Sequence, residues 1–429
     1  MPPDTFGARG FDPANPPETP VHRIAVPEAG DTPALPDVAR MRRDRLARLR
    51  AQLVQHDVAG VVLYDPINVR YATGSRNMVV WTLHNAVRYA FVATDGPVVL
   101  FDFHGCGHLS ATLDTVDETR AAIGWFFFGA GSRMEEQASR WAAEIAELVI
   151  RHGGGNRRLA ADKLDPAGAA ALAGLGITVV DGQAPCELAR LTKTPDEIAA
   201  MQQSIAVAEA GMYRMREALK PGVTENQIWA LLHETNIAHG GEWIETRLLT
   251  SGEKTNPWFQ ECGNRLLRAG DLLSFDTDLI GPYGYCADIS RTYHTGPGKP
   301  SGEQRTLYRL AWEQIHHNMA LIRPGLSYRD FAEQAMQLPE DYLPQRYSVL
   351  AHGVGFCDEY PACVYKEDFA EAGYDGVFEA NNTICVESYV GAKGGREGVK
   401  LEQQVLVTET GVALLSTFPW DDDLLGREI

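Results

Sequence analysis

Three aspartates near the middle of the chain have a spacing that suits a metal site. Asp276 and Asp278 stand two residues apart in a strand-like sequence, so both side chains are expected on one face of a strand. Two like charges this close destabilise each other unless a cation lies between them. Asp288 follows after Gly281-Pro-Tyr-Gly-Tyr285, a sequence that can turn the chain back. The spacing therefore predicts that three carboxylates converge from two antiparallel strands.

Three further side chains downstream are candidates for the same site. His352 begins His-Gly-Val-Gly, whose glycines allow a close approach of the backbone. Glu387 lies in an apolar strand, where a charge is costly without a partner, and Glu402 lies in another strand-like segment. Each acid taken alone could be an ordinary ion-pair partner, but all six in these contexts favour a metal centre. Hard oxygen donors with one imidazole suit Mn, Fe, Co or Zn, in a two-metal arrangement with bridging carboxylates.

Two similar helix-turn-helix segments flank these candidates. Lys220-Pro-Gly-Val-Thr224 is matched by Arg323-Pro-Gly-Leu-Ser327, and each segment separates a long helix from a second capped one. The first long helix is expected to begin at Pro195, with Thr194 as its N-cap in a capping box, and to end near Leu219. The repeat predicts two similar halves with the chemistry between them.

The sequence before residue 188 predicts a separate, smaller α/β domain at 37–187, and a catalytic domain at 188–429. Residues 1–36 carry nine of the 24 prolines and read as an extended arm. The elements expected in the smaller domain are a helix at 40–57, a strand at 59–64, a hairpin around Asp95-Gly96, a helix at 134–151, and strands at 159–162 and 177–180.

The composition excludes several classes of protein. With 39 Lys+Arg against 57 Asp+Glu, the net charge is -18, which disfavours nucleic-acid binding. No run of about 18 apolar residues is present, so no membrane span is expected. The N-terminus lacks a basic segment followed by an apolar one, which predicts a cytoplasmic location. Seven scattered cysteines without a CxxC pair predict neither a zinc ribbon nor a disulfide scaffold.

From about Arg40 to the C-terminus, the chain resembles the creatinase, prolidase and aminopeptidase P group of pita-bread metallopeptidases. The resemblance implies an α+β fold, with a pita-bread catalytic domain, a creatinase-like N-terminal α/β domain and a homodimer. It also implies that five of the candidates are metal ligands: Asp276, Asp288, His352, Glu387 and Glu402. The segments that carry it are Asn68–Gly74, Lys193–Ile198, Gly270–Asp276, Asp288–Thr292, His352–Gly355, Glu387 and Glu402.

The chain departs from the peptidases at the positions that they use around the scissile amide. Their Pro-His step is Pro257-Trp258 here, and their second histidine, seven residues after the metal histidine, is Glu359. Their Asp-x-Gly has become Asp276-Thr-Asp278, and Ser388 stands where a proline follows the first metal glutamate. These differences disfavour peptide hydrolysis.

The same departures resemble the dimethylsulfoniopropionate lyases built on the pita-bread fold. That resemblance implies Asp278 as a sixth metal ligand, Asp358 as the catalytic base and two metal ions, most often iron. It implies a carbon–sulfur lyase that removes a proton next to the substrate carboxylate and releases dimethyl sulfide and acrylate. A dinuclear Xaa-Pro aminopeptidase or prolidase is the rival hypothesis, and a non-catalytic binding protein on this fold is the second.

A sulfonium group is a soft cation, and the faces of aromatic rings hold such cations. Trp258 stands where the peptidases need histidine, and Trp81 and Tyr347 are further candidates for this part of the substrate pocket. In creatinase-like dimers the N-terminal domain of one subunit reaches the active site of the other, so Trp81 could act in trans. Each of these residues could instead belong to the core.

Overall fold

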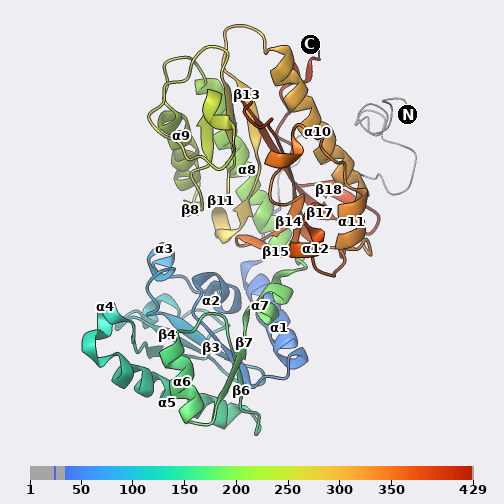
Figure 1. Cartoon of the computed structure of the whole chain (residues 1–429). Coiled ribbons are helices and arrows are strands. Elements are labelled where there is room, and N and C mark those ends of the chain that lie inside the picture. Colours follow the sequence, from blue (N-terminus) through green and yellow to red (C-terminus); the bar gives the residue numbers. More distant parts are fainter. Residues whose placement is uncertain (1–23, 26–33, 428–429) are drawn as a thin grey trace. The chain divides into compact units, whose positions relative to one another are not determined.

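The computed structural model describes residues 24–25 and 34–427, which divide into two compact units. One unit is Pro36–Arg190, and the other consists of the described residues from Leu191 onward and those before Pro36 (Figure 1). Most of the predicted arm, residues 1–36, lies outside the described residues. Within the part of the chain that is described, no helix is long and apolar enough to cross a membrane.

The N-terminal unit is a mixed six-stranded sheet with helices packed against it. Its strands run in the order β5-β4-β3-β2-β6-β7, antiparallel between β2, β3 and β4 and parallel elsewhere. The strands are β2 (Gly60–Leu63), β3 (Tyr89–Ala93), β4 (Val98–Asp102), β5 (Glu118–Ala121), β6 (Arg158–Ala161) and β7 (Thr178–Asp181). The helices are α1 (Val38–Gln55), α2 (Pro66–Thr73), α3 (Val79–Thr82), α4 (Phe127–Ala130), α5 (Met134–His152), α6 (Pro166–Gly174) and α7 (Gln183–Arg190).

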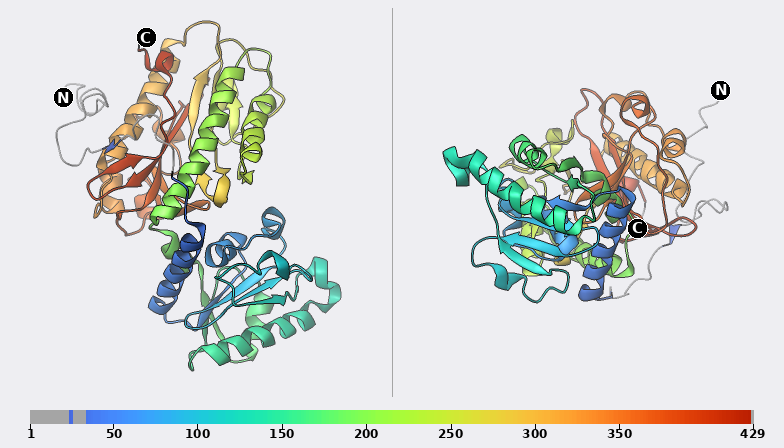
Figure 2. Two further views of the ribbon diagram at one scale, coloured as in Figure 1. Left: turned by 180° about the vertical axis from the view of Figure 1, so that it is seen from behind. Right: turned by 90° about the horizontal axis from the view of Figure 1, so that it is seen from below.

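The hydrophobic pattern predicted the main elements of this unit correctly. The apolar stripe of α1, which includes Leu46, Leu49 and Leu53, is buried, and the hairpin around Asp95-Gly96 joins β3 to β4. Figure 2 shows α5 lying along the sheet. Its apolar side chains are buried in the core of this unit. The expected domain boundary at 187/188 falls inside α7, which packs on α1, and the two units divide after Arg190.

The C-terminal unit contains one large sheet, two small sheets and two pairs of helices. The large sheet has the order β1-β18-β17-β16-β14-β15, and the small sheets are β13-β10-β9 and β12-β11-β8. Its strands are β1 (Ile24–Ala25), β8 (Trp243–Ile244), β9 (Leu249–Ser251), β10 (Leu272–Phe275), β11 (Leu279–Ile280), β12 (Cys286–Ala287), β13 (Arg291–His294), β14 (Ala351–Val354), β15 (Asp358–Cys363), β16 (Thr383–Val390), β17 (Val399–Val407) and β18 (Val412–Leu414). Its helices are α8 (Pro195–Ala218), α9 (Glu225–Ala238), α10 (Gly302–Leu321), α11 (Tyr328–Gln334), α12 (Phe369–Ala372) and α13 (Asp422–Leu425).

The repeat inferred from the two Pro-Gly segments is present in this unit. The pairs α8–α9 and α10–α11 flank the strands (Figure 1). Thr194 caps α8 in a complete capping box with Glu197, and Thr224 caps α9 in the same way. After each Pro-Gly turn, an isolated bridge ties the N-cap residue to a later segment, Thr224 to Leu266 and Ser327 to Val377. Local capping rules therefore fixed where these helices begin.

Packing of α10 makes the large sheet a firm base for the site. Leu307, Ala311, Ile315 and Met319 recur every four residues along one face of α10 and are buried in the same core as strands β16 and β17. A fully buried large apolar side chain contributes about 1.5–3 kcal/mol to stability. The packing of α10 against β16 and β17 therefore stabilises the two strands that carry Glu387 and Glu402.

Candidate metal centre and active site

Asp276, Asp278 and Asp288 lie in a hairpin whose two strands are interrupted at the same level. Pairing runs from β10 to β13 as far as Phe275 and Arg291, and resumes between β11 and β12 at Leu279 and Ala287. The prediction of one continuous strand carrying Asp276 and Asp278 is therefore wrong, because residues 276–278 belong to no strand.

The interruption brings the carboxylates together by a bend rather than by the strand pleat. Asp278 has a φ of 36°, in the left-handed region that side chains other than glycine seldom adopt. The hydroxyl of Thr246 donates a hydrogen bond of 2.6 Å to its carboxylate. Asp276, Asp278 and Asp288 each offer a ligand atom within 4.8 Å of the other two. The predicted convergence is present, although its geometry differs from the expected one.

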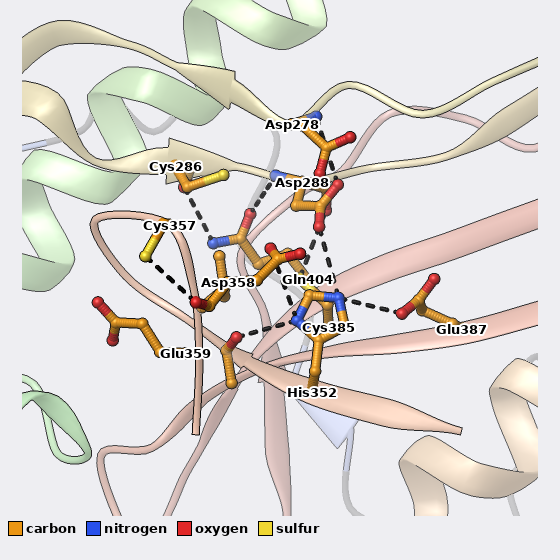
Figure 3. Close-up of polar contacts among 12 residues, drawn as sticks. Asp278, Cys286, Asp288, His352, Cys357, Asp358, Glu359, Cys385, Glu387 and Gln404 are labelled. Carbon is orange, nitrogen blue, oxygen red and sulfur yellow. Dashed lines mark hydrogen bonds and ion pairs between the residues drawn. The ribbon is translucent and has the colours of Figure 1, made fainter. Parts of the chain in front are cut away.

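The large sheet supplies His352, Glu387 and Glu402. Glu387 on β16 and Glu402 on β17 are directly opposite each other, and His352 lies on the neighbouring strand β14. The Nδ1 atom of His352 lies 2.9 Å from the carbonyl oxygen of Gly353, which accepts its hydrogen. The Nε2 atom faces the carboxylates, 3.0 Å from Glu387, 3.4 Å from Glu402 and 3.5 Å from Asp288 (Figure 3). The Nε2 atom of the imidazole thus points into the acidic cluster.

The donor atoms fit a metal ion. The Oε1 atoms of Glu387 and Glu402 are buried and accept no hydrogen bond from any described residue. Donors about 2.1 Å from one ion at right angles lie about 3 Å apart, close to the separations around His352 Nε2. The groups of potential ligands overlap, and Asp276, Asp288 and Glu402 each belong to two of them. Apart from the thiol of Cys385, which belongs to one group, this buried set consists of carboxylates and one histidine and suits divalent metal ions.

Lys400 is a member of the cluster that the sequence pattern did not identify. Its side chain is fully buried, and its Nζ lies 3.0 Å from Asp276, 2.6 Å from Glu387 and 3.3 Å from Glu402. Lys400 stands two residues before Glu402 on one strand, and such residues share a face. This spacing could have predicted that Lys400 lies beside the ligands. Lys400 neutralises one of the five carboxylate charges among the proposed ligands, which leaves four to be balanced.

Burial and mutual repulsion favour protonated carboxylates in the metal-free cluster. Burial, followed by the charge of Asp276, raises the pKa of Glu402 to about 8. The pKa values of Asp278 and Asp288 are also raised, first by burial and then by neighbouring carboxylates. Burial acts in the same direction on Asp276, but the ammonium of Lys400 holds the pKa of this carboxyl below its ordinary value.

Metal binding is therefore expected to release protons at neutral pH. Glu402, whose pKa is about 8, still carries its proton at pH 7 in the metal-free protein, and the ion must displace it. The apparent metal affinity should therefore rise with pH up to about 8 and fall in acid. Titration calorimetry in buffers of different ionisation enthalpy measures the number of protons released. A heat of binding that is independent of the buffer would contradict this prediction.

A cavity of about 410 Å³ opens beside the cluster, and Asp358 lies in it. Asp358 is the first residue of β15, and its Oδ1 is 3.8 Å from His352 Nδ1. Its side chain is 59% exposed, but the cavity walls remove enough bulk water to raise the pKa of its carboxyl, against the opposing effect of His352. The other residues lining the cavity are Glu245, Thr246, Arg247, Leu248, Phe259, Glu261, Asp276, Asp278, Asp288, Tyr347, His352 and Glu387.

The aromatic wall of the cavity consists of Tyr347 and Phe259. Their rings stack at a centroid distance of 5.3 Å, and the Nζ of Lys400 lies 4.5 Å from the centre of the Tyr347 ring. Of the two residues of this unit predicted for the pocket, Tyr347 lines the cavity and Trp258 does not. Trp258 is only 6% exposed, and its ring lies 6.1 Å from the Tyr389 ring. Phe259 has a φ of 69° and is 58% exposed, so the residue after the predicted one reaches the cavity.

Trp81 lies in the N-terminal unit, on the short helix α3. It is partly exposed, and its ring packs on Phe103 at a centroid distance of 5.8 Å. Its predicted contact with substrate stays a prediction.

The two-halved fold and its acidic cluster define the class of creatinase-like, metal-dependent enzymes. The model of Metallopeptidase family M24 matches residues 199–409. The chain is 43% identical to dimethylsulfoniopropionate lyase DddP of Roseovarius nubinhibens, over 92% of this chain and 90% of that protein. It is 41% identical to the protein of the same name from Roseobacter denitrificans, over 92% and 89%. The chain belongs to this metallopeptidase family, in the branch of the dimethylsulfoniopropionate lyases DddP.

Solved structures of peptidases share the fold. Dipeptidase PepE from Mycobacterium ulcerans superposes with a TM-score of 0.73 at 21% identity, covering 90% of this chain and 98% of that one. The Xaa-Pro dipeptidase from Bacillus anthracis gives a TM-score of 0.72 at 19% identity, with coverage of 89% and 99%. At these identities the likeness establishes the pita-bread fold alone.

Proposed function

We propose that the protein is a carbon–sulfur lyase that cleaves dimethylsulfoniopropionate to dimethyl sulfide and acrylate. The observation that carries this proposal is the placement of the Asp358 carboxylate. It opens into the same cavity as the metal-binding cluster, beside an aromatic wall. Relatives more than 40% identical over nine-tenths of the chain are named for this activity. His352 is the only histidine lining this cavity in the described part of the chain, so the second histidine of the peptidases has no counterpart there.

In this proposal Asp358 is the base. Its carboxylate removes the proton from the carbon next to the substrate carboxylate, and the electron pair of that C–H bond forms the carbon–carbon double bond. The C–S bond breaks with its electron pair going to sulfur, so dimethyl sulfide leaves as a neutral molecule and acrylate keeps its negative charge. The raised pKa of Asp358 makes it a stronger base than an ordinary aspartate.

The proposed ligands are Asp276, Asp278, Asp288, His352, Glu387 and Glu402, holding two metal ions. When bound, such ions hold the substrate carboxylate and stabilise the negative charge that develops beside it. Two divalent ions would balance the four negative charges that Lys400 leaves uncompensated among the ligands. Iron is the proposed metal because of the resemblance to the lyases, and Mn, Co and Zn suit the same donors. Elemental analysis of purified protein measures which metal is bound and how many ions are bound per chain.

Tyr347 and Phe259 are proposed to receive the sulfonium end of the substrate. The faces of aromatic rings attract a desolvated cation by about 2 kcal/mol. Glu245, Glu261 and Arg247 also line the cavity and together add a net negative charge to its wall. A neutral zwitterion thus meets acidic and aromatic groups at its cationic end and the metal cluster at its carboxylate.

Headspace detection of dimethyl sulfide tests the function directly. Metal-loaded protein is given dimethylsulfoniopropionate, and an Xaa-Pro dipeptide is incubated in parallel. Release of dimethyl sulfide without cleavage of the dipeptide supports the proposed lyase activity. Cleavage of the dipeptide without release of dimethyl sulfide would instead support the prolidase alternative.

The protein is also proposed to be a cytoplasmic homodimer in which Trp81 completes the partner's site. If so, an equal mixture of Trp81→Ala and Asp358→Asn chains, reassembled as dimers, recovers about a quarter of wild-type activity. Half of the dimers are then mixed, and each mixed dimer has one intact site of two. Light scattering measures the dimer, and each variant alone is the control. No recovery from mixed dimers would place Trp81 in the site of its own subunit, and full activity of Trp81→Ala alone would place it outside any site.

A further inference from the structure

Glu359 stands directly after the proposed base, yet its side chain turns the opposite way. Residues on a strand alternate between faces, so Asp358 opens into the cavity while Glu359 points away from the acidic cluster (Figure 3). Its side chain is only 1% exposed, and one carboxylate oxygen lies 2.9 Å from the Nζ of Lys193, which is 2% exposed. A buried charge of this kind is costly unless it is paired, and Lys193 is that partner.

The second oxygen of Glu359 holds the turn that leads into Asp358. It accepts a hydrogen bond of 2.9 Å from the backbone N–H of Phe356, three residues earlier. Gly355 allows this contact, because a Cβ there would lie 2.3 Å from the Glu359 carboxylate. One carboxylate thus joins the turn at residues 355–357 to Lys193, which precedes α8.

A second connection runs from the same turn to the same end of α8. The ring of Phe356 stacks on Tyr285 at 4.7 Å, and the Tyr285 hydroxyl donates a hydrogen bond of 2.9 Å to Glu197. Glu197 is the residue that closes the capping box of α8. The turn before Asp358 is therefore fixed on two sides to one rigid helix start.

We propose that Glu359 and Lys193 are positioning residues for the reaction, which hold the Asp358 carboxylate in line with the substrate proton. The inference rests on the proposed function, because it assigns the pair a role relative to the base. Glu359 stands where the peptidases have their second histidine, so in this proposal that position holds the turn in place instead of contacting substrate. A displacement of about 1 Å at a reacting group lowers the rate by up to about 100-fold. Greater mobility of the turn at residues 355–357 would displace the Asp358 carboxylate and should therefore lower kcat.

The test compares Glu359→Gln with Asp271→Asn as a matched control. Glu359→Gln keeps an acceptor for Phe356 N–H but turns an amide toward Lys193. Asp271 is likewise fully buried, in an ion pair with Arg265 (2.7 Å), and accepts a backbone N–H, from Arg268. We expect both variants to lower Tm and to retain metal. Only Glu359→Gln should lower kcat, by about 10- to 100-fold with KM little changed, and enlarge the kinetic isotope effect of substrate deuterated next to its carboxylate.

Lys193→Met should reproduce the effect of Glu359→Gln, and the double variant should be no slower than either single one. Hydrogen exchange at the amides of residues 355–358 in metal-loaded protein should be faster in Glu359→Gln than in Asp271→Asn. If kcat and the isotope effect match those of the control, or if exchange at the turn is unchanged, the proposal is overturned. Release of dimethyl sulfide by the wild type tests the proposed lyase activity separately. Hydrogen exchange tests whether Glu359 and Lys193 hold the turn, even if no dimethyl sulfide is formed.

Discussion

Replacing Asp358 by asparagine should lower kcat for sulfide release by about 100- to 10,000-fold, the usual contribution of a general base. The amide keeps the shape of the side chain but cannot take up the substrate proton. The metal content should be unchanged, because Asp358 faces Nδ1 of His352, away from Nε2, which points at the carboxylates. Elemental analysis and headspace assay of the same sample check both statements.

Two comparisons sharpen this result. Asp358→Glu retains a carboxylate displaced by one methylene and should recover part of the activity that asparagine loses. Loss of metal in Asp358→Asn would instead make Asp358 a ligand and remove its role as the base.

Replacing Glu402 by glutamine should weaken metal binding and remove most of the activity. Glu402 is fully buried, belongs to two groups of potential ligands and lies opposite Glu387 on the neighbouring strand. An amide at this position removes one negative charge and turns a donor toward the ions. We expect at least a tenfold loss of metal affinity and sulfide release near background.

Glu397→Gln is the matched control for this variant. Glu397 is also buried, two residues before β17 begins, and accepts hydrogen bonds from Leu272 N–H and the side chain of Gln304, outside the cluster. It should lower Tm while leaving metal content and kcat close to those of the wild type. If Glu402→Gln retains two ions per chain, the assignment of Glu402 as a ligand is wrong.

The fold was predictable to a large extent because its signals are local. Thr194 and Thr224 each satisfy the free N–H groups of a helix start within three residues, so their helices begin where the sequence indicates. The alternation and length of apolar runs likewise predicted the hairpin of β3 and β4. Such rules act within one turn or one strand and need no knowledge of distant residues.

The membership of the acidic cluster also followed from residue types. Carboxylates in apolar strands need a cation, whatever the details of the fold. The six candidates lie around one centre, although Asp276 and Asp278 reach it from a break between strands and not from a pleated strand. Residue chemistry determined which side chains meet, but not the backbone path by which they meet.

Tertiary structure alone decided the details that govern chemistry. Whether Trp258 or Phe259 faces the cavity depends on the backbone of one loop, where a φ of 69° turns Phe259 outward. The charge of Lys400 is placed among the ligands by the register of β16 against β17. Glu359 meets Lys193 across 166 residues of sequence. Sequence patterns fix local conformation and the need for partners, whereas the choice of partner depends on the packing of distant segments against one another.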